Sequence, residues 1–212
     1  MKNNITFLIK FGFAFVIIVL ISGFVFNFER LTAHKTYGEE SMYKVYALEL
    51  PDDLSFAGEK VMLQSPDLRE RLDRELLVNT YWQSNMMLLI KRANKYFPTI
   101  EKILAEEGIP ADLKYLSVIE SGLENVISPS GAKGIWQIMR STGREYGLEV
   151  NSNVDERFHL EFSTRMAAKY LKKARDKFGS WTLAAASYNR GISGIQRKLN
   201  TQNVKSLSLI HI

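Results

Sequence analysis

The segment Pro110–Gly122, with the sequence PADLKYLSVIESG, predicts a short amphipathic helix. Pro110 suits a first helical turn, and Ser121-Gly122 provides a stop signal at the other end. The side chains that share one face at spacings of three and four are Leu113, Leu116, Glu120 and Leu123. One carboxylate therefore lies on a stripe of leucines.

Two interpretations of Glu120 follow from this pattern. A charged carboxylate that is buried without a partner costs several kcal/mol, so the side chain either has an altered pKa or faces a cleft that uses it. Alternatively, Glu120 lies in water at the frayed end of the helix, next to Gly122. We favour the cleft, although the pattern alone leaves both interpretations open.

The composition excludes several classes of site. The chain has 212 residues and no cysteine, which rules out disulfides, thiolate metal sites and cysteine nucleophiles. The histidines are too far apart in sequence to form a metal-ligand motif: His34, His159 and His211. No glycine-rich phosphate or dinucleotide loop is present. We therefore expect neither a metal nor a cofactor.

The charge balance permits an acidic partner without selecting one. The formal net charge is +5, which suits an anionic membrane face, a cell-wall polymer or nucleic acid. The basic residues are spread over predicted helix faces and are not interleaved with exposed aromatic residues, so no nucleic-acid partner is expected. The sequence does not indicate an oligomeric state.

The N-terminal region contains an apolar run from Phe11 to Phe26, preceded by Lys2 and Lys10. With the apolar residues before it, the run approaches the ~20 residues that cross a bilayer as a helix. It ends without the small residues of a signal-peptide cleavage site, so we favour an uncleaved transmembrane anchor over a secretory signal helix. A buried core helix is the remaining alternative.

The organisation predicted from these signals is an N-terminal anchor or signal segment (1–30), a connector (31–64), a helical domain (65–203) and an atypical tail (204–212). The connector should hold one extended segment at 42–50. The first predicted helix begins at Ser65, and the next two cover 81–96 and 99–107. A long helix is predicted at 155–178, with Phe162, Met166, Tyr170 and Ala174 on one face, and a short one at 181–189. Pro98 should separate the second helix from the third. The apolar side chains of 81–96, including Trp82 and Ile90, are expected in the core.

Three ordered motifs now point to a family: Glu120-Ser121-Gly122, SGAKGIWQIM at 130–139 and ASYNRG at 186–191. Together they resemble the catalytic domain of the soluble-type (SLT) lytic transglycosylases, which have an all-α, goose-type lysozyme-like fold. The segments 141–148 and 155–157 look like the membrane-bound lytic murein transglycosylase D group. The resemblance covers about residues 65 to 203.

The resemblance implies cleavage of the bond between N-acetylmuramic acid and N-acetylglucosamine in peptidoglycan, with formation of a 1,6-anhydro ring. It implies Glu120 as the single catalytic residue, and it places in the sugar groove Ser121, Gln137, Met139, Tyr188 and Asn189. Trp136 is expected to pack under the turn, and Lys133 to be solvated or to meet acidic stem peptides. The implied partners are peptidoglycan glycan strands and the membrane, with the catalytic domain in the periplasm.

Two alternatives stay open beside this assignment. The same fold could support a hydrolytic muramidase, or a non-catalytic, membrane-tethered protein that binds peptidoglycan. The family usually continues past the Tyr-Asn motif with a helix that adds a tyrosine to the active site, whereas residues 204–212 (VKSLSLIHI) do not resemble such a continuation. We therefore expect a truncated domain.

Overall fold

The computed structural model of this protein describes residues 46–61 and 63–202. Apart from one small hairpin, the regular structure in this part of the chain is helical, as predicted. The elements in chain order are β1 (Ser55–Phe56), β2 (Glu59–Lys60), α2 (Pro66–Tyr81), α3 (Gln83–Glu106), the 3₁₀ helix η1 (Ala111–Lys114), α4 (Tyr115–Ser121), α5 (Arg140–Glu145), the 3₁₀ helix η2 (Glu156–Phe158), α6 (Leu160–Phe178), α7 (Trp181–Arg190) and α8 (Ile192–Gln202).

The predicted membrane segment at 1–30 and the tail at 204–212 lie outside the described residues. None of the helices that the structure describes is long and apolar enough to cross a bilayer. The predicted extended segment at 42–50 is not found where it was expected. Residues 46–50 have no regular structure, residues 42–45 are not described, and the two strands begin at Ser55.

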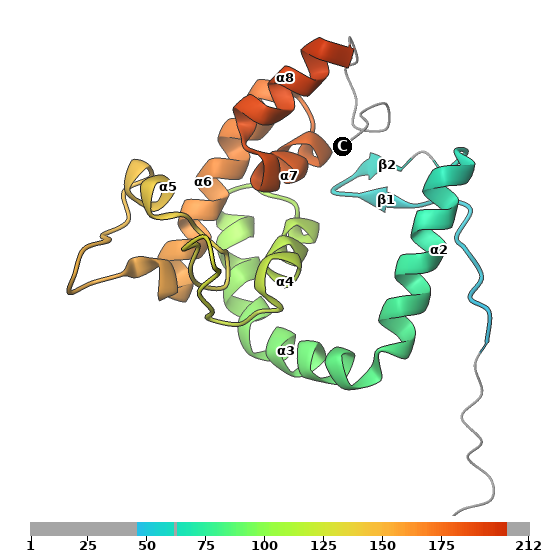
Figure 1. The fold of residues 1–212 in the computed structure, drawn as a ribbon, viewed down its shortest axis with the longest axis horizontal. Helices are drawn as coiled ribbons and strands as arrows, with labels where there is room; N and C mark the ends of the chain where they lie inside the picture. The colour runs from blue at the N-terminus through green and yellow to red at the C-terminus, as the bar shows by residue number, and fades with distance from the viewer. Residues whose placement is uncertain (1–45, 62, 203–212) are drawn as a thin grey trace, which may run out of the picture. The chain divides into compact units, whose positions relative to one another are not determined.

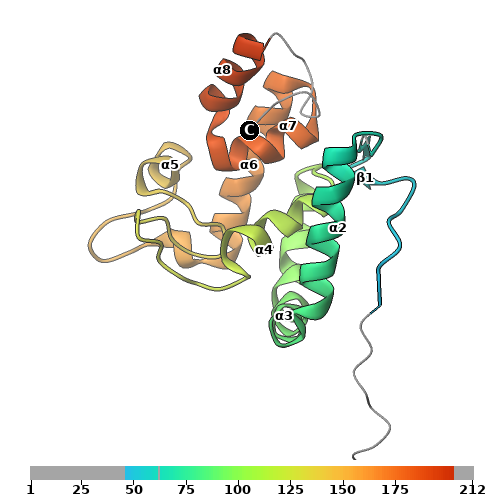
Figure 2. The same cartoon turned by 45° about the vertical axis from the view of Figure 1, so that its right-hand side comes forward.

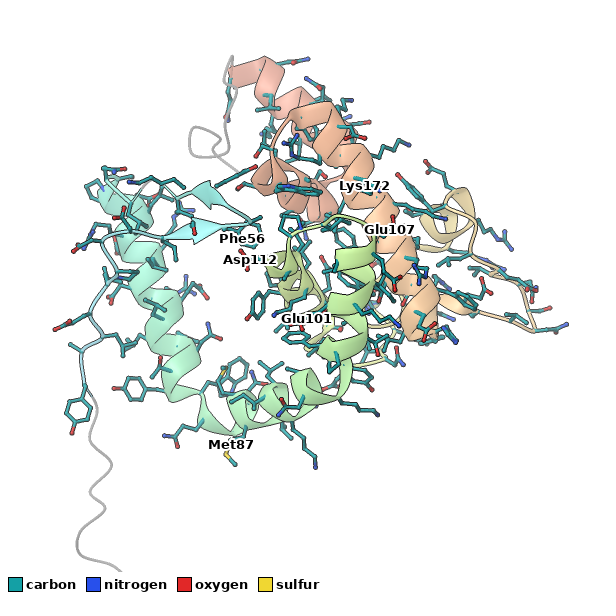
Figure 3. The ribbon with its side chains drawn as sticks, turned by 180° about the vertical axis from the view of Figure 1, so that it is seen from behind. Phe56, Met87, Glu101, Glu107, Asp112 and Lys172 are labelled. Atoms are coloured by element: carbon teal, nitrogen blue, oxygen red, sulfur yellow. The ribbon has the colours of Figure 1, made fainter. Side chains whose placement is uncertain are left out.

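The hairpin β1–β2 turns at Ala57 and Gly58, which both have positive φ angles of 53° and 76°. Two such residues suit the tight turns that join antiparallel strands. The backbone N–H of Ala57 donates to the Asp112 carboxylate at 2.7 Å. Figure 3 shows Phe56 at the tip of the hairpin and Asp112 near each other. The hairpin is therefore attached to the segment that carries Glu120.

Helix α3 runs through Pro98, so the predicted break before this proline is wrong. Proline removes only one donor to the preceding turn, and side chains on both sides of it hold the helix in place. Ile100 and Leu104 are fully buried, and Tyr96 and Phe97 pack against the same core. Tertiary packing thus outweighs the local cost of the proline.

The corner between α2 and α3 is more exposed than its sequence suggested. Trp82 and Ile90, which we expected in the core, are 56% and 57% exposed, and no residue of α2 is buried. Met87 is 71% exposed and projects from the outer side of the bend in Figure 3. The apolar repeat predicts a helix here correctly, but it does not predict which of the helix side chains are buried.

The core is built where α3, α6 and α7 meet. Helix α7 packs on α6, and α8 packs on α7 (Figures 1 and 2). Small side chains allow this close approach, because Ala167, Ala174 and Ala184 are completely buried. Of the predicted α6 stripe, Met166 and Ala174 are buried and Tyr170 is partly buried. Phe162, on the same predicted face, is 45% exposed and stacks on His159.

Candidate active site

Glu120 lies in the last turn of α4, next to the glycine that ends the helix. Gly122 has φ 61° and ψ 29°, the left-handed conformation that suits a glycine C-cap. Leu116 and Leu123 are buried beside it, while Glu120 itself is partly buried. Burial raises the pKa of the Glu120 carboxyl above its ordinary value. The side chain is therefore neither in a dry core nor free in solvent.

Glu120 differs from the other carboxylates near it in sequence. Those of Glu106 and Glu107 make ion pairs with Arg165 and Lys172 of α6, at 2.8 and 3.3 Å. Figure 3 shows Glu107 and Lys172 side by side. Glu124 pairs with Arg92 of α3. Within residues 46–61 and 63–202, Glu120 has no ion pair and no side-chain hydrogen bond, and it is the carboxylate whose pKa is raised.

The loop between α4 and α5 folds tightly under the site. Lys133 forms antiparallel bridges with Ile127 and Ile138, which fold the loop back on itself. Gly134 has φ 79°, and a Cβ placed on it would lie 2.0 Å from the carbonyl oxygen of Arg157. Gln137 also adopts a positive φ, 45°, and its side-chain amide nitrogen Nε2 donates to the Gly134 carbonyl at 2.8 Å. Glycine at 134 is thus required both by conformation and by contact.

An ion pair fixes this loop from below. The Arg157 guanidinium is almost completely buried and donates two hydrogen bonds of 2.8 Å to the Asp155 carboxylate. It also donates to the carbonyl oxygens of Gly131 and Ile138, both at 3.1 Å. The hydrogen bonds from Arg157, with a further contribution from Lys133, lower the pKa of Asp155 to about 2. Such a bidentate pair is geometrically specific.

The third part of the site is Tyr188, in α7. Its hydroxyl donates to the carbonyl oxygen of Trp136 at 2.8 Å. Its ring packs edge-on against Tyr170, with 5.5 Å between the ring centres. Burial, and then the nearby charges of Glu120 and Tyr170, raise the pKa of Tyr188 well above 10. The Tyr188 hydroxyl therefore stays neutral, and the charge of Glu120 contributes to its raised pKa.

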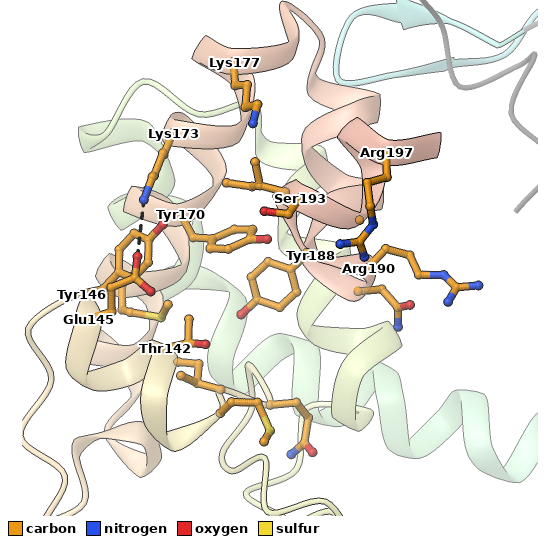
Figure 4. A pocket seen from close by; sticks show the side chains of 18 residues that line it. Thr142, Glu145, Tyr146, Tyr170, Lys173, Lys177, Tyr188, Arg190, Ser193 and Arg197 are labelled. Carbon is orange, nitrogen blue, oxygen red and sulfur yellow. Dashed lines mark hydrogen bonds and ion pairs between the residues drawn. The ribbon is translucent and has the colours of Figure 1, made fainter. Parts of the chain in front are cut away.

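A cavity of about 720 Å³ opens beside these residues. Figure 4 shows Tyr170 and Tyr188 at its centre and Thr142 on the opposite wall. Four of the six predicted site residues line it: Gln137, Met139, Tyr188 and Asn189. Glu120 and Ser121 are not among its lining residues. Residues of the second and third motifs therefore line one cavity. Glu120 is linked to this cavity by its charge, which contributes to the raised pKa of Tyr188.

Contacts in the structure show the roles of two further residues near the site, Trp136 and Lys133. Trp136 is completely buried, and its indole N–H donates to the Thr164 hydroxyl at 2.9 Å, so it packs under the turn as predicted. Lys133 is partly buried and paired rather than free in solvent, since its ammonium lies 3.2 Å from the Asp155 carboxylate. That contact also leaves Lys133 poorly placed for an acidic peptide.

Sequence reasoning missed Arg157, Tyr170 and Glu59 as supports of the site. Asp155 and Arg157 are two residues apart, a spacing that carries no general signal for a buried ion pair. Glu59 accepts four hydrogen bonds at the start of α7, from Ser180, Trp181 and Thr182. Partial burial acts to raise the pKa of Glu59, but these hydrogen bonds outweigh it and lower the pKa.

Comparison with known proteins decides the family. Residues 98–210, which contain all three motifs, match the family described as "Transglycosylase SLT domain". This chain belongs to that family. The SLT-domain match begins in the middle of α3 and includes Glu120, the loop under it and Tyr188.

Individual relatives agree with this membership. The chain is 29% identical over 159 residues to "Membrane-bound lytic murein transglycosylase D" of Escherichia coli (strain K12), an alignment that covers 73% of this chain and 34% of that protein. The protein of the same name from Escherichia coli O6:H1 matches equally well. A protein of Alteromonas sp. (strain M-1) named for tributyltin chloride resistance is 26% identical over 121 residues, covering 56% of this chain and 58% of that one. The SLT-domain chain thus spans about a third of the length of its Escherichia coli relatives.

Proposed function

We propose that this SLT-domain protein is a peptidoglycan lytic transglycosylase in which Glu120 is the catalytic acid and base. The observation that carries the proposal is the state of Glu120 in the described residues: partly buried, without an ion pair, and with a raised pKa. A carboxyl in that state holds its proton to a higher pH than an exposed one, as a general acid requires. The names of the Escherichia coli relatives supply the substrate, murein.

The proposed reaction uses one protein carboxyl twice. Protonated Glu120 donates its proton to the glycosidic oxygen as the bond to the muramic acid anomeric carbon breaks. The substrate's N-acetyl group stabilises the positive charge that develops. The Glu120 carboxylate then removes the proton from the muramic 6-hydroxyl, whose oxygen attacks the anomeric carbon and closes the 1,6-anhydro ring. The proton returns to Glu120, and no water is consumed.

A second carboxylate would favour an ordinary glycosidase instead. Such enzymes use two carboxyl groups on either side of the bond that breaks. Glu145 is the carboxylate that lines the cavity, and it is paired with Lys173 at 3.4 Å. Glu145 is exposed, whereas Glu120 is partly buried with a raised pKa, so we prefer Glu120 as the acid and a mechanism with one protein carboxylate and a substrate-supplied group.

We assign the sugar groove to the cavity, with Gln137, Met139, Tyr188 and Asn189 as contacts. Met139 is 42% exposed there and offers an apolar surface for a sugar face, and Asn189 is exposed at the end of α7. Ser121 is the remaining predicted contact. Its hydroxyl donates to the Ile135 carbonyl at 2.8 Å, so it would meet substrate through its oxygen lone pairs.

The proposal is tested with purified sacculi and the full chain in detergent. Wild-type protein should release muropeptides with 1,6-anhydro ends, identified by mass spectrometry, and Glu120→Gln should lower the rate about 10²- to 10⁴-fold. Glu106→Gln is the matched control, because Glu106 is held in a surface ion pair with Arg165. Reducing ends in place of anhydro ends would identify a muramidase. Binding of sacculi without either product would identify a non-catalytic protein.

We further propose that residues 1–30 anchor the protein in the membrane, with the catalytic domain on the periplasmic side where peptidoglycan lies. The apolar run from Phe11 to Phe26 supports this location. Cell fractionation tests it: the protein should stay with the membrane after a high-salt wash and be digested by protease added to spheroplasts. Release by salt, or protection from the protease, would contradict it.

A further inference from the structure

The lining of the cavity carries an excess of positive charge. Its basic lining residues are Lys173, Lys177, Arg190 and Arg197, and its one acidic lining residue is Glu145. Glu145 is already paired with Lys173. Lys177, Arg190 and Arg197 have no carboxylate partner among residues 46–61 and 63–202. We call these three side chains the basic rim.

The fold brings the basic rim together from three helices. Lys177 lies one turn beyond Lys173 on α6, so both project from the same face. Arg190 ends α7, and Gly191, with φ 73°, redirects the chain into α8, which carries Arg197. Figure 4 shows Arg190 and Arg197 next to each other at one edge, with Lys177 on another.

The positive surface extends beyond the cavity. Arg190 and Arg197 also line an adjoining hollow of about 320 Å³, which contains Lys198 as well. A carbohydrate chain without charges gains little from such a concentration of cations. Guanidinium groups are the side chains best suited to bind carboxylates through paired hydrogen bonds.

We propose that the basic rim binds free carboxylates of the peptides attached to muramic acid, so that the protein prefers glycan strands that carry peptides. This inference rests on the proposed function. The glycan would lie along the Gln137–Met139 side of the cavity, and its peptide would extend over Arg190 and Arg197. Lys133 does not take this role, because it is held by Asp155.

The experiment measures binding in the Glu120→Gln background, so its readout does not depend on turnover. Soluble glycan strands are prepared with their peptides and, in parallel, with the peptides removed by an amidase and the lactyl carboxylates that this exposes converted to neutral methylamides. The ratio of the two dissociation constants should favour peptide-bearing strands. It should fall about 2- to 5-fold in each of Lys177→Gln, Arg190→Gln and Arg197→Gln, the size expected for exposed charge pairs. Raising the salt concentration should lower the ratio as well.

Lys169→Gln is the matched control, since Lys169 is an exposed lysine of α6 outside the cavity. It should leave the ratio unchanged. A chain that binds both kinds of strand equally would overturn the proposal, and so would variants that weaken both by the same factor, which is the signature of a merely structural role. Absence of anhydro products from the wild-type protein would count against the proposed function alone.

Discussion

The hydroxyl of Tyr188 donates to the carbonyl oxygen of Trp136 at 2.8 Å, while the preceding carbonyl, that of Ile135, accepts from the Ser121 hydroxyl at 2.8 Å. Two consecutive peptide units of one loop are therefore held by two different helices, α7 and α4. Glu120 neighbours Ser121, so this double attachment sets the position of the acid relative to Tyr188.

Tyr188→Phe should remove one of these attachments while keeping the ring. The carbonyl of the completely buried Trp136 would lose its donor, which is expected to cost about 1–3 kcal/mol of unfolding free energy. Urea unfolding measures the loss, and turnover on sacculi should fall with it because the loop is no longer held. Tyr115→Phe is the control: Tyr115 is 49% exposed, so its change should stay within about 0.5 kcal/mol. Equal stability of the two variants would contradict a tethering role.

Gly134→Ala and Gly131→Ala form a matched pair in the same loop. Both glycines have positive φ, 79° and 84°, so alanine is strained at either position by about 1 kcal/mol. Only at Gly134 does the new Cβ also meet backbone, 2.0 Å from the Arg157 carbonyl oxygen, whereas nothing lies within 4 Å at Gly131. Gly134→Ala should therefore destabilise the protein by several kcal/mol more, as measured by thermal unfolding. Similar melting temperatures would show that the loop can move away from Arg157.

Asp155→Asn should make the protein less stable at neutral pH and less sensitive to acid. The pKa of Asp155 is lowered from 3.8 to about 2, so its contribution is present above pH 4 and is lost as the pH falls toward 2. The shift corresponds to about 2 kcal/mol. Urea unfolding at a series of pH values should show a gap between wild type and variant that closes in this range. A gap that is constant with pH would contradict the assignment.

Glu120→Gln should change the pH dependence of stability in the opposite direction to Asp155→Asn. Because burial raises the pKa of Glu120 above its ordinary value of 4.5, the native state is destabilised as the pH rises through the raised pKa and the carboxyl ionises. The variant should be at least as stable as wild type at pH 7, and its advantage should vanish below pH 4.5. Paired unfolding measurements at pH 4 and pH 7 test this. If Glu120→Gln instead lost stability relative to wild type between pH 4 and pH 7, the surroundings of Glu120 would be stabilising its charged form.

Local signals in the sequence predicted helices correctly where the determinants lie within a turn or two. Ser180 directly precedes α7 and caps it, because its hydroxyl accepts from the Leu183 N–H. The leucines around Glu120 are buried as their spacing indicated. Periodicity reports that a helix has an apolar face, but the identity of the partner is a property of the whole fold. The exposed Trp82 and Phe162 show that limit.

The supports of the site depend on contacts between distant segments. Gln137 takes a left-handed conformation that no residue pattern required, and it does so within a loop closed by Arg157. Pro98 predicted a break that packing overrides. Short motifs therefore pointed to the candidate site residues, whereas the contacts that hold these residues in place join distant segments and form no short motif.

The carboxylate of Glu59 receives the backbone N–H groups of Trp181 and Thr182 at 2.5 and 3.0 Å, so the first turn of α7 is completed by a residue 39 positions before the SLT-domain match at 98–210. The boundary of the family and the boundary of the folding unit are therefore different in this protein. A fragment trimmed to residues 98–210 would keep Tyr188 and lose the anion at the start of the helix that carries it. A fragment that keeps this contact has to start before Glu59, in or upstream of the hairpin.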